Sequence, residues 1–381
     1  MKKFSNVILV MGMLVSIQLH GQTWSGLTRL TWNPGDSLWP IIATDAGSGI
    51  HVVWGDYSTV NSEIFYKKST DNGTTWTGLT RMTWNSGDSW LPSVAADSNT
   101  GIHVVWDDGT PGNREIYYKR STDSGATWSG LTRMTWNSGA SSAPVVAADS
   151  SNRIHVVWYD GTSSNAEILH KRSTDGGATW SGITRLTFNS GDSLWPSIAT
   201  DSSGGIHVVW EDGTPGNDEI FYKSSSDSGV TWSGLTRLTW NADNSYTPSI
   251  AADSTNGIHV VWCDTPGNGD IFYKRSTDSG ANWSGITRLT WNSGGSYEPC
   301  IAADSSGGIH LIWEDGTPGN EEIFYKSSSD SGATWSAITR LTWNSGESYY
   351  PSIAGDSSSG CHTVWCDETP GNFDIYYKNR K

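Results

Sequence analysis

The sequence predicts an all-β protein, a seven-bladed β-propeller with four antiparallel strands in each blade. Three observations predict this fold: a repeat of 51 or 52 residues, four strand-like segments in each repeat, and chain ends that complete one another. The repeat is marked by tryptophans at Trp24, Trp76, Trp128, Trp180, Trp232, Trp283 and Trp335. Such a period is typical of folds in which each unit buries its apolar face against its neighbours.

One repeat illustrates the four strands. Residues Pro196–Thr200, Ile206–Trp210, Glu219–Lys223 and Trp232–Thr239 are rich in Val, Ile, Tyr, Trp and Thr, and clusters of Gly, Pro, Asn, Asp and Ser separate them. Short β-prone segments between turn residues predict strands, and no helical periodicity competes with them. Four strands in about fifty residues, repeated, favour propeller blades.

The two ends of the chain predict ring closure. The last repeat stops after its third strand at residues 376–378, whereas Trp24–Thr31 begins the repeat region as a fourth strand without a blade. Pairing the two completes a seventh blade and leaves no open sheet edge. A solenoid, the alternative, needs atypical capping repeats. We therefore expect residues 22–381 to form one propeller, closed by the N-terminal strand.

Residues 1–21 have the pattern of a signal peptide. Lys2 and Lys3 precede an apolar run at residues 7–19, and Gly21 is a small residue before the expected cleavage point. The run is too short to predict a membrane span. The sequence therefore predicts a secreted or periplasmic protein.

The charge balance limits the partners. The chain has 24 basic and 39 acidic residues and a formal net charge of −15, with no basic stripe. This excludes a phosphate-binding surface, so we expect no nucleic-acid partner, and we expect no membrane insertion. Glycans or surface proteins are the expected partners of a chain that we expect to be a monomer.

A turn motif connects the third and fourth strands. The first copy contains Ser69, Asp71, Gly73 and Trp76, and the pattern Ser-x-Asp-x-Gly-x-x-Trp occurs six times. The motif resembles the Asp-box, or BNR repeat, of the sialidase-like propellers. The resemblance implies structural roles, away from an active site, for Asp71, Asp123, Asp175, Asp227, Asp278 and Asp330. It identifies a scaffold, and a scaffold alone does not confer activity.

The resemblance also implies what a sialidase requires: three converging arginines and a Tyr/Glu pair. The chain has no Arg-Ile-Pro motif, and its repeated arginines lie in Thr-Arg-Leu/Met-Thr segments of the outermost strands, at Arg29, Arg81, Arg133, Arg185, Arg237, Arg288 and Arg340. We therefore predict no catalytic residues and favour a non-enzymatic function. An exo-sialidase or other glycoside hydrolase is the third hypothesis.

Other repeated polar residues have structural interpretations. Histidines in the second strands (His51 and its six equivalents) are expected to be hydrogen-bonded between blades, and aspartates after the first strands (Asp45 and its equivalents) to cap turns. We predict no metal site and no cofactor, with a Ca²⁺ ion in the channel as the alternative. Cys263 and Cys300 lie in adjacent blades and are candidates for a disulfide.

The connection from the fourth strand to the next first strand varies most, on the face opposite the Asp boxes. Exposed aromatics beside acids suit sugar rings and their hydroxyls. The candidate ligand-binding residues are Trp39, Trp90, Trp195, Tyr246, Tyr297, Tyr349, Tyr350, Asp36, Asp88, Asp192 and Glu347. The leading hypothesis is multivalent glycan binding through these loops. The alternative is a protein-interaction or cell-surface structural propeller, in which these aromatics form a docking patch. The alternative for the aromatics themselves is a structural role, in which they pack over the blade tops.

Overall fold

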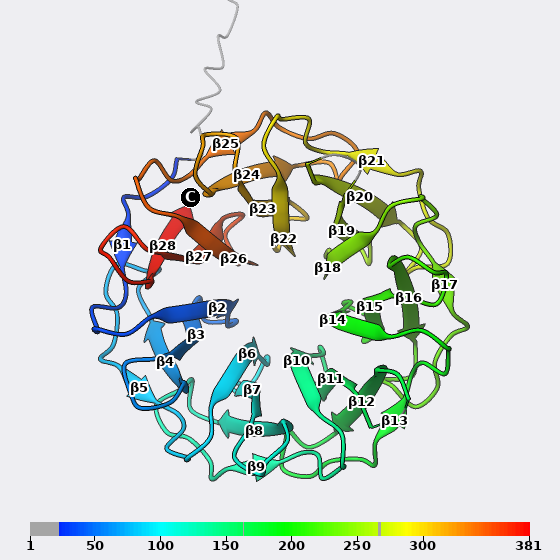
Figure 1. Cartoon of the computed structure of the whole chain (residues 1–381), viewed down its shortest axis with the longest axis horizontal. Coiled ribbons are helices and arrows are strands. Elements are labelled where there is room, and N and C mark those ends of the chain that lie inside the picture. Colours follow the sequence, from blue (N-terminus) through cyan, green and yellow to red (C-terminus); the bar gives the residue numbers. More distant parts are fainter. Residues whose placement is uncertain (1–22, 163, 266–267) are drawn as a thin grey trace, which may run out of the picture.

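The computed structural model describes residues 23–162, 164–265 and 268–381. These residues form seven four-stranded antiparallel sheets arranged as a ring around a central axis (Figure 1). The prediction of a seven-bladed, all-β propeller is confirmed. The predicted signal peptide, residues 1–21, lies outside the described residues. Within them, the structure has no helix with the length and hydropathy of a membrane span.

Each blade is an antiparallel meander from the axis to the perimeter. The innermost strands are β2 (Ser37–Thr44), β6 (Ser89–Ala96), β10 (Ser141–Ala148), β14 (Ser193–Thr200), β18 (Ser245–Ala252), β22 (Ser296–Ala303) and β26 (Ser348–Gly355). The second strands are β3 (Ile50–Asp56), β7 (Ile102–Asp108), β11 (Ile154–Asp160), β15 (Ile206–Asp212), β19 (Ile258–Asp264), β23 (Ile309–Asp315) and β27 (Cys361–Asp367).

The two outer positions differ greatly in length. The third strands are β4 (Glu63–Ser69), β8 (Glu115–Ser121), β12 (Glu167–Ser173), β16 (Glu219–Ser225), β20 (Asp270–Ser276), β24 (Glu322–Ser328) and β28 (Asp374–Arg380). The outermost strands are two residues each: β5 (Thr80–Arg81), β9 (Thr132–Arg133), β13 (Thr184–Arg185), β17 (Thr236–Arg237), β21 (Thr287–Arg288), β25 (Thr339–Arg340) and β1 (Thr28–Arg29).

The N-terminal strand closes the ring. β1 pairs with β28, so that Thr28 lies opposite Tyr377 and Arg29 opposite Tyr376. A bridge between Trp24 and Arg380 extends this contact. The seventh blade therefore has the order β1-β28-β27-β26, with strands from both ends of the chain, as the sequence predicted.

All four predicted strands of the illustrated repeat have wrong bounds: the second and third end two residues later, at Asp212 and Ser225, and the first and fourth differ more. The fourth strand is only Thr236–Arg237, because the Thr239 hydroxyl takes the place of a backbone acceptor and receives the Ile220 amide at 2.8 Å. The first strand begins at Ser193 rather than Pro196, because Ser193 and Leu194 still pair with the second strand. The variable aromatics therefore lie in the innermost strands and not in loops.

The second strands form the core between blades. Their tryptophans, such as Trp54 and Trp106, are fully buried, and each apolar cluster contains residues of two adjacent blades. In six blades the buried histidine contacts a tyrosine hydroxyl, as His51 Nδ1 does with Tyr66 at 2.8 Å. The histidines are hydrogen-bonded as predicted, although Tyr66 and Asp45, the partners of His51, belong to its own blade.

The Ser-x-Asp-x-Gly-x-x-Trp turn links six of the seven blades to the preceding one. In the first copy, Asp71 accepts hydrogen bonds from the Thr75 hydroxyl at 2.6 Å, the Thr75 amide at 2.8 Å and the Ser69 hydroxyl at 2.8 Å, and these bonds lower its pKa to about 2. Gly73 has a φ of +79°, and a Cβ there would lie 2.1 Å from the Tyr377 hydroxyl of the preceding blade. Only glycine therefore fits this contact.

The candidate disulfide is absent, and both cysteines are free thiols. Cys263 packs in the cluster that contains Ile301, and its thiol donates to the Ser296 carbonyl at 3.3 Å. Neighbouring side chains of a strand point to opposite faces, so Cys300 faces away from that cluster and packs beside Ile353 instead. The two sulfurs therefore belong to different blade interfaces.

Candidate functional site

Each innermost strand carries a β-bulge at a residue followed by proline. The pairing of β2 with β3 jumps from Leu38 to Ile41, which leaves Trp39 and Pro40 outside the ladder. Proline has no amide proton to donate, so it is tolerated here at the channel edge of the sheet. The residue before it has a positive φ in all seven blades, between +46° and +53°: Trp39, Leu91, Ala143, Trp195, Thr247, Glu298 and Tyr350.

These seven residues, which we call the axial mouth, surround one cavity. The cavity has a volume of about 470 Å³ and is lined by the mouth residues, the prolines that follow them and the next residues of most innermost strands. This volume is within the range of small-molecule sites. No arginine is among its described lining residues. The bulge therefore gathers seven different side chains around the propeller axis.

The axial mouth is not symmetric. Trp39 and Tyr350 come from adjacent blades, and their ring centroids are 6.2 Å apart. Trp195 is on β14, which lies across the ring from β2 and β26 (Figure 1). Glu298 supplies the only carboxylate among the described lining residues of the cavity. The mouth thus has two facing aromatic walls and one acidic side.

The predicted aromatics fall into two groups. Trp39, Trp195 and Tyr350 line the cavity, whereas Trp90, Tyr246, Tyr297 and Tyr349 are one position earlier in the repeat and are not among its lining residues. Successive side chains of a strand alternate between faces, which separates the groups.

Contacts of the second group are with surface hairpins. Trp90 donates to the Tyr57 hydroxyl at 3.0 Å, and the Arg114 guanidinium lies 4.1 Å from the centre of its ring. Tyr297 donates to the Asn268 carbonyl at 2.6 Å. For these residues the arrangement agrees with the alternative in which the aromatics pack over the blade tops.

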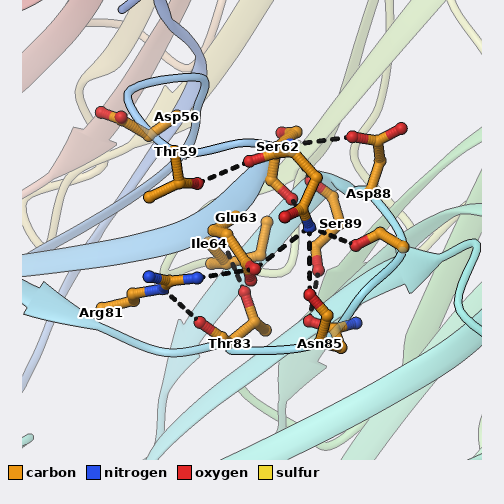
Figure 2. A network of polar contacts seen from close by, with 12 residues as sticks. Asp56, Thr59, Ser62, Glu63, Ile64, Arg81, Thr83, Asn85, Asp88 and Ser89 are labelled. Carbon is orange, nitrogen blue, oxygen red and sulfur yellow. Dashed lines mark hydrogen bonds and ion pairs between the residues drawn. The ribbon is translucent and has the colours of Figure 1, made fainter.

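The predicted acids connect neighbouring blades. Asp88 accepts the backbone amide of Ser62 in the preceding blade at 2.8 Å (Figure 2). The other three carboxylates make the equivalent contact: Asp36 with the Phe373 amide at 3.0 Å, Asp192 with the Ala166 amide at 2.7 Å, and Glu347 with the Glu321 amide at 2.6 Å. All four therefore stabilise the ring, and none is among the described lining residues of the cavity.

Sequence reasoning missed Leu91, Ala143, Thr247 and Glu298. The signal that identifies them is position rather than residue type: each directly precedes the proline that every repeat retains. Sequence reasoning also missed two acids that directly follow the repeated tryptophan of a second strand. Glu211 accepts the Thr247 amide at 3.3 Å, and Glu314 accepts the Tyr350 amide at 3.1 Å.

The pKa values of Glu211, Glu298 and Glu314 are all raised. Burial raises the pKa of Glu314 to about 8, with a further contribution from the Glu298 charge. Burial also raises the pKa of Glu211 to about 7, and it raises the pKa of Glu298. Three carboxyl groups with weakened acidity therefore lie in blade four, which holds Glu211, and in blade six, which holds Glu298 and Glu314. Such groups in a concave site are typical of functional sites.

Other charged groups have structural partners. The outer-strand arginines pair with an acid that begins the third strand, as Arg81 does with Glu63 at 2.8 Å (Figure 2). The Asp45 carboxylate caps its own turn by accepting the Gly49 amide at 2.7 Å. In the described part of the chain, no group of three or more His, Cys, Asp or Glu side chains is arranged to hold a metal ion.

Comparisons with solved structures bear on the fold. An ulvan lyase, from a new family of polysaccharide lyases, superposes with a TM-score of 0.65 at 10% identity, over 92% of this chain and 95% of that chain. The NanB sialidase of Streptococcus pneumoniae gives 0.53 at 14% identity, over 92% and 70%. An α-L-arabinofuranosidase from Fusarium graminearum gives 0.58 at 15%, over 77% and 92%.

The chain has the sialidase-like propeller fold. At these identities the likeness concerns the fold alone. No known protein family matches the sequence, and no curated protein is significantly similar to it. The Asp-box interpretation of the turn motif therefore stays a prediction.

Proposed function

We propose that this protein binds a neutral saccharide at the axial mouth. The observation that carries the proposal is one cavity of about 470 Å³ with Trp39 and Tyr350 on one side, Trp195 on the other and Glu298 between them. Indole and phenol rings stack on the apolar faces of a sugar ring, and a carboxyl group exchanges hydrogen bonds with its hydroxyls.

The charge of the site favours a neutral ligand. A chain with a net charge of −15 and a glutamate at the mouth repels an anionic sugar. The described lining residues also include no arginine that would hold a carboxylate or sulfate. A neutral glycan is not repelled by the negative charge and needs no arginine partner.

One ligand at this mouth replaces the multivalent arrangement that we expected. Only Trp39, Trp195 and Tyr350 of the seven candidate aromatics line the cavity. The other four are one position earlier in the innermost strands, and two of them, Trp90 and Tyr297, contact surface hairpins. We therefore propose a single axial glycan site with no catalytic step.

A glycan array followed by titration calorimetry tests the proposal. The double variant Trp39→Ala, Trp195→Ala is expected to lose at least tenfold in affinity for the glycan that the wild type binds. Trp90→Ala is the matched control, because Trp90 is a neighbouring aromatic outside the cavity. Absence of any neutral glycan ligand, or an equal loss in the control, would contradict the proposal.

Cleavage of a glycan is a second candidate. It is favoured by Glu298 in the cavity and by the raised pKa of the nearby Glu314, since glycoside hydrolysis needs a protonated and an ionised carboxyl group. Assays with a fluorogenic sialoside and a fluorogenic neutral glycoside distinguish the candidates. We expect no turnover by the wild type. Turnover by the wild type that is lost in Glu298→Gln would show that the protein is a hydrolase and would replace the proposal of a binding protein.

The setting of the protein is also a proposal. The predicted signal peptide supports a secreted or periplasmic location, and we propose that the propeller acts there as a monomer on glycans. A protein-interaction or structural propeller is the alternative, and the calorimetric experiment separates it, because such a protein would bind no free saccharide.

A further inference from the structure

The tryptophan of the Leu-Thr-Trp-Asn segment has no role in the mouth. It follows each outermost strand and is Trp in six blades and Phe in one. These aromatics, which we call the outer rim, are exposed by 62–74%: Trp32, Trp84, Trp136, Phe188, Trp240, Trp291 and Trp343. A large aromatic that is exposed at the same position of every blade forms a repeated surface feature, which singly scattered exposed residues do not.

Burial in the core does not explain the outer rim, whose tryptophans lie near an arginine of their own blade, as Trp84 does near Arg81 at 5.9 Å from its ring centre. The other two repeated tryptophans have clear structural roles: Trp106 is fully buried, and Trp128 contacts Tyr66 of the preceding blade edge-on at 4.9 Å between ring centroids. The rim tryptophans leave about two thirds of their surface to solvent. They contribute correspondingly less to the core.

The best-formed copy is a groove between the first and second blades. Met82, Thr83, Trp84 and Asn85 follow the outermost strand of one blade, and Asp108, Lys119 and Leu131 come from the next, around a volume of about 280 Å³. Lys119 fixes the junction because its ammonium group donates to the Met82 carbonyl at 2.8 Å and lies 5.3 Å from the Trp84 ring centre.

The same arrangement is present around the ring. A lysine of the following blade lies 5.0–5.6 Å from the ring centre of all six rim tryptophans. An exposed leucine or isoleucine of the outer strands accompanies each blade: Leu27, Leu79, Leu131, Ile183, Leu235, Ile286 and Ile338. The rim is therefore a set of seven nearly equivalent sites.

We infer that the outer rim binds neutral polysaccharide chains, one sugar ring at each junction, with the pyranose face on the indole and its hydroxyls toward Asn, Asp and Lys side chains. The charges at one junction cancel: Lys119 and Arg81 are balanced by Asp108 and by Glu63, which pairs with Arg81 at 2.8 Å. A neutral ligand meets no net field there.

The geometry favours a polymer over a globular partner. The outermost strands occupy the whole perimeter of the ring (Figure 1), so their sites face outward in all directions. A globular protein contacts one sector, whereas a long or branched polysaccharide reaches several sites. Individually weak sites then give a strong combined attachment. This inference does not depend on the axial saccharide site.

Affinity electrophoresis tests the inference, with soluble xylan, galactomannan and mixed-linkage β-glucan as neutral probes and polygalacturonate as an anionic one. The wild type is expected to be retarded by at least one neutral gel and not by polygalacturonate. Successive replacement of Trp84, Trp240, Trp291 and Trp343 by Ala is expected to weaken retardation stepwise, by tenfold or more for the quadruple variant. Replacement by Phe, the residue of the fourth blade, is expected to retain most of it.

The control is Trp90→Ala, at a tryptophan outside both the outer rim and the cavity, which is expected to be retarded like the wild type. The mouth variant Trp39→Ala, Trp195→Ala reports any part of the retardation that comes from the axial mouth. Because the rim side chains are exposed, the quadruple variant should keep its melting temperature within a few degrees. Retardation that the rim variants do not change, retardation that the mouth variant alone abolishes, or no retardation in any neutral gel would overturn the inference. The calorimetric result for the mouth is independent of all three outcomes.

Discussion

The axial mouth and the outer rim use the same seven-fold repeat in opposite ways. At the mouth, equivalent positions hold Trp, Leu, Ala, Trp, Thr, Glu and Tyr, whereas at the rim they hold six Trp and one Phe. The backbone is nearly identical in all seven copies, with a φ of +46° to +53° at each mouth position. The repeated backbone therefore determines where each side chain lies, and the residue types at the equivalent positions determine what kind of surface they form.

The difference follows from where the copies meet. The seven mouth residues converge on one cavity, so each is part of a single, asymmetric surface. The rim residues lie at separate junctions, each beside a lysine of the following blade. Positions that meet at the axis therefore differ in residue type between blades, whereas positions that lie apart at the perimeter keep nearly the same residue type. The following predictions break or sharpen this contrast.

The largest effect is expected where every copy must be the same. Gly125→Ala places a Cβ 2.0 Å from the Tyr66 hydroxyl at a φ of +76°, and Gly332→Ala places one 1.8 Å from the Tyr273 hydroxyl. Each change is expected to lower the free energy of unfolding by about 3 kcal/mol, because overpacking and a strained φ add. Chemical denaturation measures it.

Gly130→Ala is the matched control, because a Cβ there has no described atom within 4 Å. Its expected change is under about 0.5 kcal/mol. Similar losses in Gly125→Ala and Gly130→Ala would show that the contact between the turn and the tyrosine does not hold the blades together.

A medium effect is expected at the acidic side of the mouth. The pKa of Glu314 is raised from 4.5 to about 8, so the folded protein keeps a proton that the unfolded chain releases near pH 4.5. Stability contributed by this group is therefore complete below about pH 4.5 and is lost as the pH rises toward 8. Glu314→Gln cannot ionise, so its advantage over the wild type should grow by up to a few kcal/mol as the pH rises to 8–9.

Denaturation curves at pH 5 and pH 8.5 measure this difference. Glu368→Gln, at an exposed position, is the control and is expected to show no such growth with pH. An advantage of Glu314→Gln that is the same at both pH values would refute a protonated Glu314 at the mouth.

The smallest effect is expected from strain at the mouth. Thr247 is β-branched, has a φ of +47°, and its buried hydroxyl has no hydrogen-bond partner in the described structure. Thr247→Gly is expected to stabilise the protein by about 1 kcal/mol, because both costs disappear. Ala143→Gly, at an equivalent φ of +49° without a hydroxyl, should gain less. Destabilisation by Thr247→Gly in the same denaturation assay would reject this account.

Much of the fold was predictable because it depends on local chemistry. Turn residues, β-branched and aromatic runs and the repeat length predicted the strands, and the incomplete terminal units predicted the pairing of β1 with β28. Strand ends were predicted less well. The Thr239 hydroxyl replaces a backbone acceptor, and the bulge at Trp195 lies within a strand. Neither is visible in a hydrophobic pattern.

The candidate site was predictable only in part. Residue type identified Trp39, Trp195 and Tyr350, but it also selected Trp90 and Tyr297, which alternation along the strand directs elsewhere. Residue type passed over Glu298 and Ala143, because neither stands out in a sequence. The acids Asp36, Asp88, Asp192 and Glu347 suggested ligand binding, yet their carboxylates hold backbone amides of the preceding blades.

The sequence by itself determined the number of blades, the order of strands and the closure of the ring, because each depends on a repeated unit that reads the same in every copy. Tertiary structure decided which copies of a variable position act together. Side chains 52 residues apart become neighbours only when the ring closes, and a shift of one residue in a strand moves a side chain from the cavity to the surface. For that reason, the repeat indicates the scaffold, whereas the axis of the closed ring indicates the site.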